Sequence, residues 1–144
     1  MIVLISFPKQ ERTLFGKAAR VVGIAPHVRY IEPKDAMDKE VLHSRRRGGK
    51  GFPKVLVLNL DDPHNDWRDV LRTLKTDDAW RNIPVMGLSF HSEPAMIEDF
   101  YRLRGASYIR KPATRSELLF ITRRAMSYWL NVTTLPNEFL ASAL

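Results

Sequence analysis

The stretch Lys54-Val55-Leu56-Val57-Leu58-Asn59-Leu60 decides the fold, because it is the strongest signal for a buried strand in this chain. It is apolar, contains β-branched residues, and is followed at once by Asp61-Asp62-Pro63, which ends the run. In an open α/β sheet, chemistry gathers outside the carboxyl ends of such strands. A carboxylate at that place could bind a metal ion or accept a phosphoryl group. Asn59 offers an amide instead, which is neutral, a weak metal ligand and a poor nucleophile.

Strand-like and helix-like segments alternate outward from this run in both directions. Apolar runs predict strands over residues 2–6, 28–32, 54–59, 84–89 and 107–110. Helical spacing and capping residues predict helices over residues 9–22, 35–44, 66–75, 92–105 and 114–130. Asp35 and Ser92 are the expected N-caps of two helices, and Thr114-Arg115-Ser116-Glu117 is a capping box that opens the last one. Strands separated by helices of this length imply a parallel sheet that is covered on both faces.

Composition bounds the class of protein. The 144 residues suffice for one domain with a real core, expected at residues 1–130 and followed by a tail at 131–144. The chain has no cysteine, which excludes a disulfide framework and any thiolate site. No stretch approaches the roughly 20 apolar residues of a membrane span, and the apolar start lacks the basic lead of a signal peptide. We therefore expect a cytoplasmic protein without membrane contact.

Two further segments indicate which known family of parallel-sheet proteins the chain resembles. Pro84-Val85-Met86-Gly87-Leu88-Ser89 is an apolar strand that ends in a hydroxyl residue, and Tyr108-Ile109-Arg110-Lys111-Pro112 is a strand that ends in Lys-Pro. Together with the alternation over residues 1–130, they resemble the fourth and fifth strands of the receiver domain of bacterial response regulators. The loop at 45–53 and the ending at 128–136 also resemble the small stand-alone receivers that are paired with phytochrome kinases.

The resemblance implies a flavodoxin-like doubly wound sheet of five parallel strands in the order 2-1-3-4-5, with helices on both faces. It also implies a role in two-component signal transduction, with a histidine kinase or another signalling protein as partner. In that family Tyr108 would be the switch aromatic, and the Lys111–Pro112 peptide bond would be cis. We expect no enzymatic activity.

The chain departs from the receiver pattern at the phosphorylation site. A working receiver holds magnesium with two acidic residues after the first strand and with the aspartate after the third strand. These positions fall on Ser6, Phe7 and Asn59, so all three carboxylates are gone. The part of the apparatus that senses phosphate remains, at Ser89, Tyr108 and Lys111. We therefore predict a pseudo-receiver without metal or cofactor, in which Lys111 hydrogen-bonds the Asn59 amide.

A displaced acceptor is the alternative to a pseudo-receiver. In that case the chain would be an ordinary phosphorylatable receiver, with Asp61 or Asp62 as the acceptor. Asp61 matches a position that offers only its backbone carbonyl to the metal, and we expect its side chain to point away from the site. The four histidines are scattered without the spacing of a zinc site, which requires three or four convergent ligands.

Charge and surplus apolar residues predict partners. The net charge of +7 favours partners with an acidic surface. The basic residues form two groups, namely Arg45, Arg46, Arg47 and Lys50, and Arg102, Arg104, Arg110, Arg115, Arg123 and Arg124. Such groups predict weak, non-specific nucleic-acid binding, and a nucleic-acid-associated regulator is the alternative function.

The last helix and the tail carry more apolar residues than one sheet-covering stripe requires. An apolar surplus of this kind is typical of an interface. We therefore predict a homodimer built on the last two helices, the fifth strand and the tail. Its interface contains Leu119, Phe120, Met126, Trp129, Leu130 and Leu135. Packing of the tail on its own subunit remains the alternative.

Overall fold

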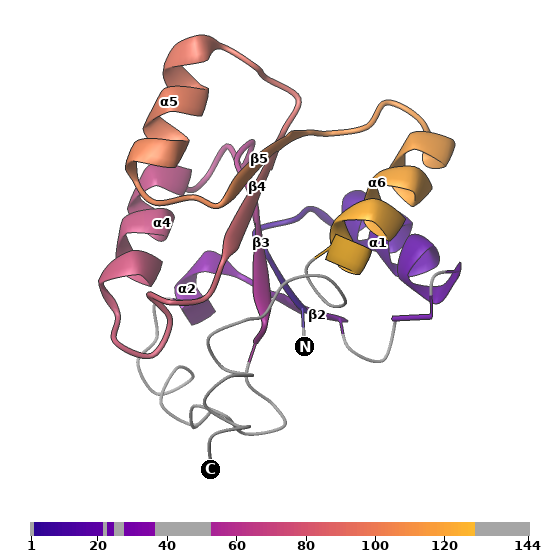
Figure 1. Ribbon diagram of the computed structural model, residues 1–144, viewed down its shortest axis with the longest axis horizontal. Helices are drawn as coiled ribbons and strands as arrows, with labels where there is room; N and C mark the ends of the chain where they lie inside the picture. Colours follow the sequence, from indigo (N-terminus) through magenta and orange to yellow (C-terminus); the bar gives the residue numbers. More distant parts are fainter. Residues whose placement is uncertain (1, 22, 25–27, 37–52, 129–144) are drawn as a thin grey trace.

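The computed structural model describes residues 2–21, 23–24, 28–36 and 53–128, which build a parallel sheet with helices on both faces (Figure 1). The strands are β1 (Ile2–Ile5), β2 (Val28–Ile31), β3 (Val55–Asn59), β4 (Val85–Ser89) and β5 (Ser107–Arg110). The helices are α1 (Lys9–Val21), α2 (Pro33–Ala36), α4 (Trp67–Thr76), α5 (Pro94–Arg102) and α6 (Arg115–Ser127). The strand order is β2-β1-β3-β4-β5 and every pairing is parallel, which confirms the predicted fold class.

Among the described helices, two cover one face of the sheet and three cover the other. Figure 1 shows α1 and α6 on one side and α2, α4 and α5 on the opposite side. Because successive side chains of a strand point to opposite faces, each strand feeds both layers. In β3, Val55 and Val57 pack towards α1 and α6, whereas Leu56 and Leu58 join the core beneath α4 and α5. Burial on both faces is why β3 reads as a continuous apolar run rather than an alternating one.

The core on the α4 and α5 side is built around the ring of Phe100, which is fully buried. A Cβ placed on Gly87 would lie 2.6 Å from this ring, and one placed on Gly105 would lie 2.1 Å from it. Both distances are shorter than atoms tolerate, so the two glycines leave the space that the ring occupies. Trp67 also contacts the ring, with their centroids 6.0 Å apart.

The helix boundaries confirm some predictions and correct others. Thr114 caps α6, since its hydroxyl accepts the Glu117 N–H at 3.2 Å. The prediction for Ser92 was wrong, because Glu93 is the N-cap of α5, and Pro94 then begins the helix. Asp35 is not an N-cap either. It lies inside α2, which begins at Pro33, because a proline at the first helical position loses no hydrogen bond.

Several predicted elements lie outside the described residues. They are the helix beyond residue 36, the basic loop at 45–52 and the tail at 131–144. None of the described helices is long and apolar enough to cross a membrane.

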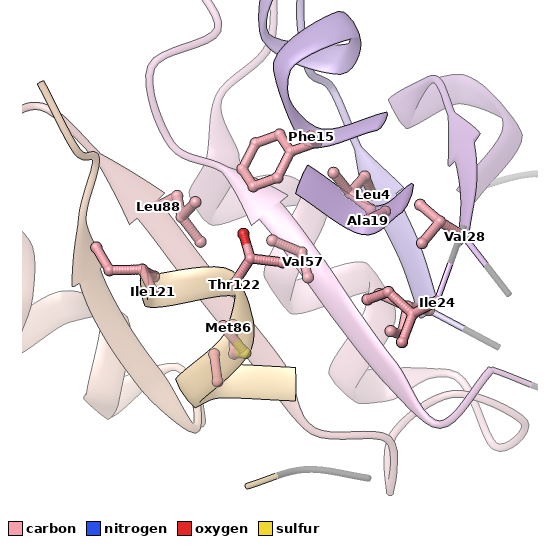
Figure 2. A pocket seen from close by; sticks show the side chains of 12 residues that line it. Leu4, Phe15, Ala19, Ile24, Val28, Val57, Met86, Leu88, Ile121 and Thr122 are labelled. Atoms are coloured by element: carbon pink, nitrogen blue, oxygen red, sulfur yellow. The ribbon is translucent and has the colours of Figure 1, made fainter. Parts of the chain in front are cut away.

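A small apolar cavity of about 30 Å³ lies between α1, α6 and the sheet (Figure 2). Phe15, Val57 and Ile121 are among the side chains that line it. Thr122 also lines it, and its buried hydroxyl has no hydrogen-bond partner within the described part of the chain. A cavity of this size holds about one water molecule, so we assign it no ligand.

Candidate functional site

The polar residues predicted from the sequence gather at the carboxyl edge of the sheet. Because the strands are parallel, Asn59 at the end of β3, Ser89 at the end of β4 and Lys111 just after β5 lie along one edge. Their exposed fractions are 3%, 0% and 8%, so all three side chains are buried. Buried polar groups require partners, and these partners show how the site is organised.

The Asn59 amide holds two neighbouring loops together. Its Nδ2 donates to the backbone carbonyl of Ser6 at 2.9 Å, and its Oδ1 accepts the Asp61 N–H at 3.1 Å. The first bond joins the end of β3 to the loop after β1, and the second turns the chain after β3. A carboxylate could not make the first bond, because it has no N–H to donate.

The carboxylate of Asp61 lies at the centre of the edge. Its Oδ1 accepts the Ser89 hydroxyl at 2.5 Å, and its Oδ2 accepts the Phe90 N–H at 2.9 Å. The ammonium of Lys111 lies 3.1 Å from Oδ2. A hydroxyl, a backbone N–H and an ammonium therefore converge on one carboxylate, and bonds of this charge-assisted kind are the strong ones in proteins.

The prediction that the Asp61 side chain points away from the site was wrong. Side chains alternate with a period of two residues, so positions 59 and 61 face the same side and position 60 faces the other. Leu60 accordingly packs into the core beneath α4 and α5. The hydrogen bond from the Asp61 N–H to Asn59 then fixes the turn that carries the carboxylate towards β4.

Lys111 contacts two carboxylates and not the Asn59 amide, which corrects another prediction. Its Nζ lies 3.0 Å from Glu11 Oε1 and 3.1 Å from Asp61 Oδ2. The Phe90 ring centroid lies 4.8 Å from the same nitrogen. Charged acceptors bind an ammonium more strongly than a neutral amide does. The amide oxygen of Asn59 is moreover already bonded to a backbone N–H.

Sequence reasoning missed Glu11. It stands in the first turn of α1, directly after the loop that follows β1, and the topology brings that turn to the carboxyl edge. Its place in this turn was the available signal, but no spacing pattern relates it to Lys111, which is 100 residues away. The Lys111–Pro112 peptide bond is trans, contrary to the resemblance, and the two isomers of such a bond differ by only about 0.5–1 kcal/mol.

Asp61 is held in its charged form. Burial alone would raise the pKa of its carboxyl group, but the Ser89 hydroxyl, the Phe90 N–H and the Lys111 ammonium together lower that pKa below its usual value. Each of these donors stabilises the carboxylate and has less to offer the protonated acid. The site therefore carries a fixed negative charge at neutral pH.

The two positions of the missing acidic pair hold a hydroxyl and an apolar ring. Ser6 has a φ of 71°, and its hydroxyl donates to the carboxylate of Asp62. Phe7 is 4% exposed and packs edge-on against an aromatic ring of α1. Burial alone would raise the pKa of Asp62, but the Ser6 hydroxyl, the His64 N–H and the Asn65 amide lower it.

These residues do not fit a magnesium site. Magnesium takes hard oxygen ligands in an octahedral arrangement, of which carboxylates are the usual protein contribution. At this edge, Glu11 and Asp61 are bound to Lys111, and Asp62 is bound to Ser6. Within the described residues, no three His, Cys, Asp or Glu side chains gather closely enough to hold a metal ion.

A continuous series of hydrogen bonds joins the site to α5. The hydroxyl of Ser89, which donates to Asp61, accepts the His91 N–H at 2.9 Å. The carbonyl of His91 accepts the Tyr108 hydroxyl at 2.5 Å. The Tyr108 N–H in turn donates to the hydroxyl of Tyr101, in the last turn of α5, at 3.0 Å.

The outer surface of α6 carries part of the predicted interface. Leu119 is half-buried, and Phe120 is 59% exposed with the Arg124 guanidinium 5.1 Å from its ring centroid. The side chain of Met126 and the residues Trp129, Leu130 and Leu135 lie outside the described structure. The second basic group is exposed throughout, at Arg102, Arg104, Arg110, Arg115, Arg123 and Arg124.

Two proteins from other organisms are similar to this chain in sequence. A probable methanogenesis regulatory protein, FilR2 of Methanothrix harundinacea, is 26% identical over 131 residues, which are 90% of this chain and 83% of that protein. The response regulator Rcp1 of Synechocystis is 32% identical over 85 residues, which are 58% of this chain and 57% of that protein. No family model matches the sequence.

Solved structures of response regulators share the fold. A response regulator in red light signaling of R. palustris superposes with a TM-score of 0.77 and 22% identity, over 94% of this chain and 97% of that one. The phosphorylated cyanobacterial phytochrome response regulator RcpA superposes with a TM-score of 0.73 and 27% identity, over 94% of this chain and 96% of that one. The chain thus has the fold of response-regulator receiver domains, and it is similar in sequence to the response regulator Rcp1 and to the phytochrome response regulator RcpA.

Proposed function

We propose that this protein is a receiver module that signals through protein–protein contact and is not switched by phosphorylation of an aspartate. The observation that carries the proposal is the state of Asn59 at the end of β3. Its amide is buried and bonded at both ends, to Ser6 and to Asp61. An amide in this place cannot act as the nucleophile that attacks a phosphoryl donor.

The metal requirement of phosphoryl transfer supports the same conclusion. Charge that develops on the phosphoryl group is neutralised by magnesium in enzymes of this chemistry. Ser6 and Phe7 supply no carboxylate, and the nearby acidic side chains are already paired with Lys111 or Ser6. A donor such as acetyl phosphate would therefore meet neither an acceptor nor a metal at this edge.

A displaced acceptor at Asp61 or Asp62 fits the geometry less well. Asp61 Oδ1 is bonded to Ser89, and its Oδ2 accepts from Phe90 and Lys111. Lone pairs that accept strong hydrogen bonds are poorer nucleophiles, and an attack by this carboxylate would have to break those bonds first.

Mass spectrometry of the intact protein after treatment with acetyl phosphate and magnesium tests the proposal. We expect no added phosphoryl mass, because no group of acidic side chains in the described part of the chain could hold the metal ion. Phosphorylated RcpA is the natural positive control, since that protein carries the modification. A magnesium-dependent adduct on any aspartate would refute the proposal, and peptide mapping would identify the acceptor.

The basic face is the proposed contact for a partner. The exposed arginines of α5, β5 and α6 complement an acidic surface on a histidine kinase or another signalling protein. The same charge predicts weak association with nucleic acid that is lost as salt rises, because no described element offers a means of reading bases. Titration of duplex DNA at two salt concentrations separates these cases. Tight, sequence-dependent binding at high salt would instead favour a nucleic-acid-associated regulator.

We also propose the homodimer on the last two helices, β5 and the tail, and α6 carries the described residues that support it. Phe120 is a large aromatic residue that stands 59% exposed on the outer surface of this helix, with half-buried Leu119 beside it. Phe120→Glu should abolish the dimer while leaving the fold intact, because Arg124 can pair with the new carboxylate. Val21→Glu on α1, where the native side chain is 58% exposed, is the matched control. Light scattering that finds a wild-type monomer would refute the dimer.

A further inference from the structure

We infer that the Asp61 carboxylate is a built-in anion that permanently holds the loop after β4 and, through it, Tyr108 and the α5–β5 face in one arrangement. This inference rests on the proposed function, since it explains what takes the place of a phosphoryl group as the source of negative charge. It concerns the state in which the module is held, whereas the proposed function concerns whether the module accepts phosphate.

The donors around Asp61 form a site for an oxyanion. Ser89 contributes a hydroxyl and Phe90 a backbone N–H from the end of β4, and Lys111 contributes an ammonium from the end of β5. A hydroxyl, a backbone N–H and an ammonium are the groups that bind phosphate and carboxylate oxygens in proteins. Here a side chain of the same chain supplies the oxygens, so the site is filled without any ligand.

The hydrogen bonds continue from this site to the α5–β5 face. The Ser89 hydroxyl accepts the His91 N–H, and the His91 carbonyl accepts the Tyr108 hydroxyl. The Tyr108 ring packs edge-on against Phe100, with their centroids 5.7 Å apart. Loss of the Asp61 carboxylate would release the Ser89 hydroxyl and the Phe90 N–H, which fix the loop after β4. The His91 carbonyl, which accepts the Tyr108 hydroxyl, would then move with the loop.

A neutral side chain at position 59 is compatible with a charged carboxylate at position 61, which explains why the residue at the end of β3 is an asparagine. The Asn59 Oδ1 accepts the Asp61 N–H and so positions the Asp61 carboxylate. An aspartate at position 59 would place a second negative charge on the same side of the strand. Like charges at this separation oppose each other, so a neutral amide at 59 allows residue 61 to carry the single anion.

Amide hydrogen exchange measured by NMR on the full chain tests the inference. In Asp61→Ala, we expect the Phe90 and Tyr108 amides to exchange at least about tenfold faster than in wild type, the equivalent of one lost hydrogen bond. Millimolar inorganic phosphate should restore protection in Asp61→Ala and leave the wild type unchanged. Asp62→Asn is the matched control, because its carboxylate bonds Ser6 and not the loop after β4.

A second variant keeps the test decisive if Asp61→Ala does not fold. Ser89→Ala retains the carboxylate but removes the hydroxyl that links it to His91, so it should also speed exchange at Tyr108. Unchanged Phe90 and Tyr108 amides in a folded variant, or no response to phosphate, would overturn the inference. That failure differs from the failure of the proposed function, which is a phosphoryl adduct on the wild-type protein.

Discussion

Replacing Asn59 by aspartate should destabilise the protein without restoring phosphorylation. The change removes the hydrogen bond from Nδ2 to the Ser6 carbonyl, which is 2.9 Å long and buried. It also places a carboxylate that is nearly inaccessible to water on the same side of the strand as Asp61. Lys111 is already bound to Asp61 and Glu11, so it offers this new charge little compensation.

The size of the effect follows from these two losses. The missing hydrogen bond costs about 1 kcal/mol, and the poorly paired carboxylate together with the orphaned Ser6 carbonyl costs roughly 1–3 kcal/mol more. The free energy of unfolding should fall by about 2–4 kcal/mol at neutral pH, which lowers Tm by roughly 4–16 °C for a domain of this size.

The pH dependence of the defect distinguishes charge from packing. Burial and the neighbouring carboxylate would raise the pKa of the new acid at position 59 above its unfolded value. A raised pKa in the folded state means that the variant loses stability as pH rises above about 4, so the defect should be smaller in acid than at neutral pH.

Urea unfolding at neutral pH and at about pH 4 measures this defect. Asn82→Asp is the control, because it makes the same chemical change at an exposed residue. A variant at position 59 that is as stable as wild type at neutral pH would refute the reasoning. Magnesium-dependent phosphorylation of that variant would show that a working site needs only the missing nucleophile.

The remaining predictions concern the charge of Asp61 and the packing of the core. Because the pKa of Asp61 is lowered in the folded state, its stabilising contribution should be present above about pH 4 and lost in stronger acid. In Asp61→Asn, the free energy of unfolding should therefore fall less on acidification than it does in wild type. Gly105→Ala should cost about 1–3 kcal/mol in urea unfolding, because its Cβ would lie 2.1 Å from the Phe100 ring. Gly16→Ala is its control, since the nearest atom is 3.6 Å away, and a lower stability there would undermine the steric explanation. Thr122→Val should raise stability by about 1 kcal/mol, because it removes a buried hydroxyl that has no partner among the described residues; a measured loss would show that the hydroxyl has a partner.

The sequence by itself determined the parallel sheet and the missing acidic residues. The continuous apolar run that ends at Asn59 predicted a strand buried on both faces, and its alternation with helices predicted the parallel sheet. The strand order came from the resemblance to receiver domains, and the structure confirms it. The identity of the residues at positions 6, 7 and 59 needs no structure, because the absence of a carboxylate is a matter of covalent chemistry.

The tertiary structure alone decided which groups meet at the carboxyl edge. Glu11 and Lys111 lie 100 residues apart, and only the packing of α1 beside the end of β5 brings their charges to 3.0 Å. The place of Asp61 depended on the turn after β3, which is fixed by a hydrogen bond from its own N–H to Asn59. Hydrophobic periodicity specifies faces and elements, whereas the directions of polar side chains at strand ends follow from hydrogen bonds between distant segments, which leave no periodic pattern in the sequence.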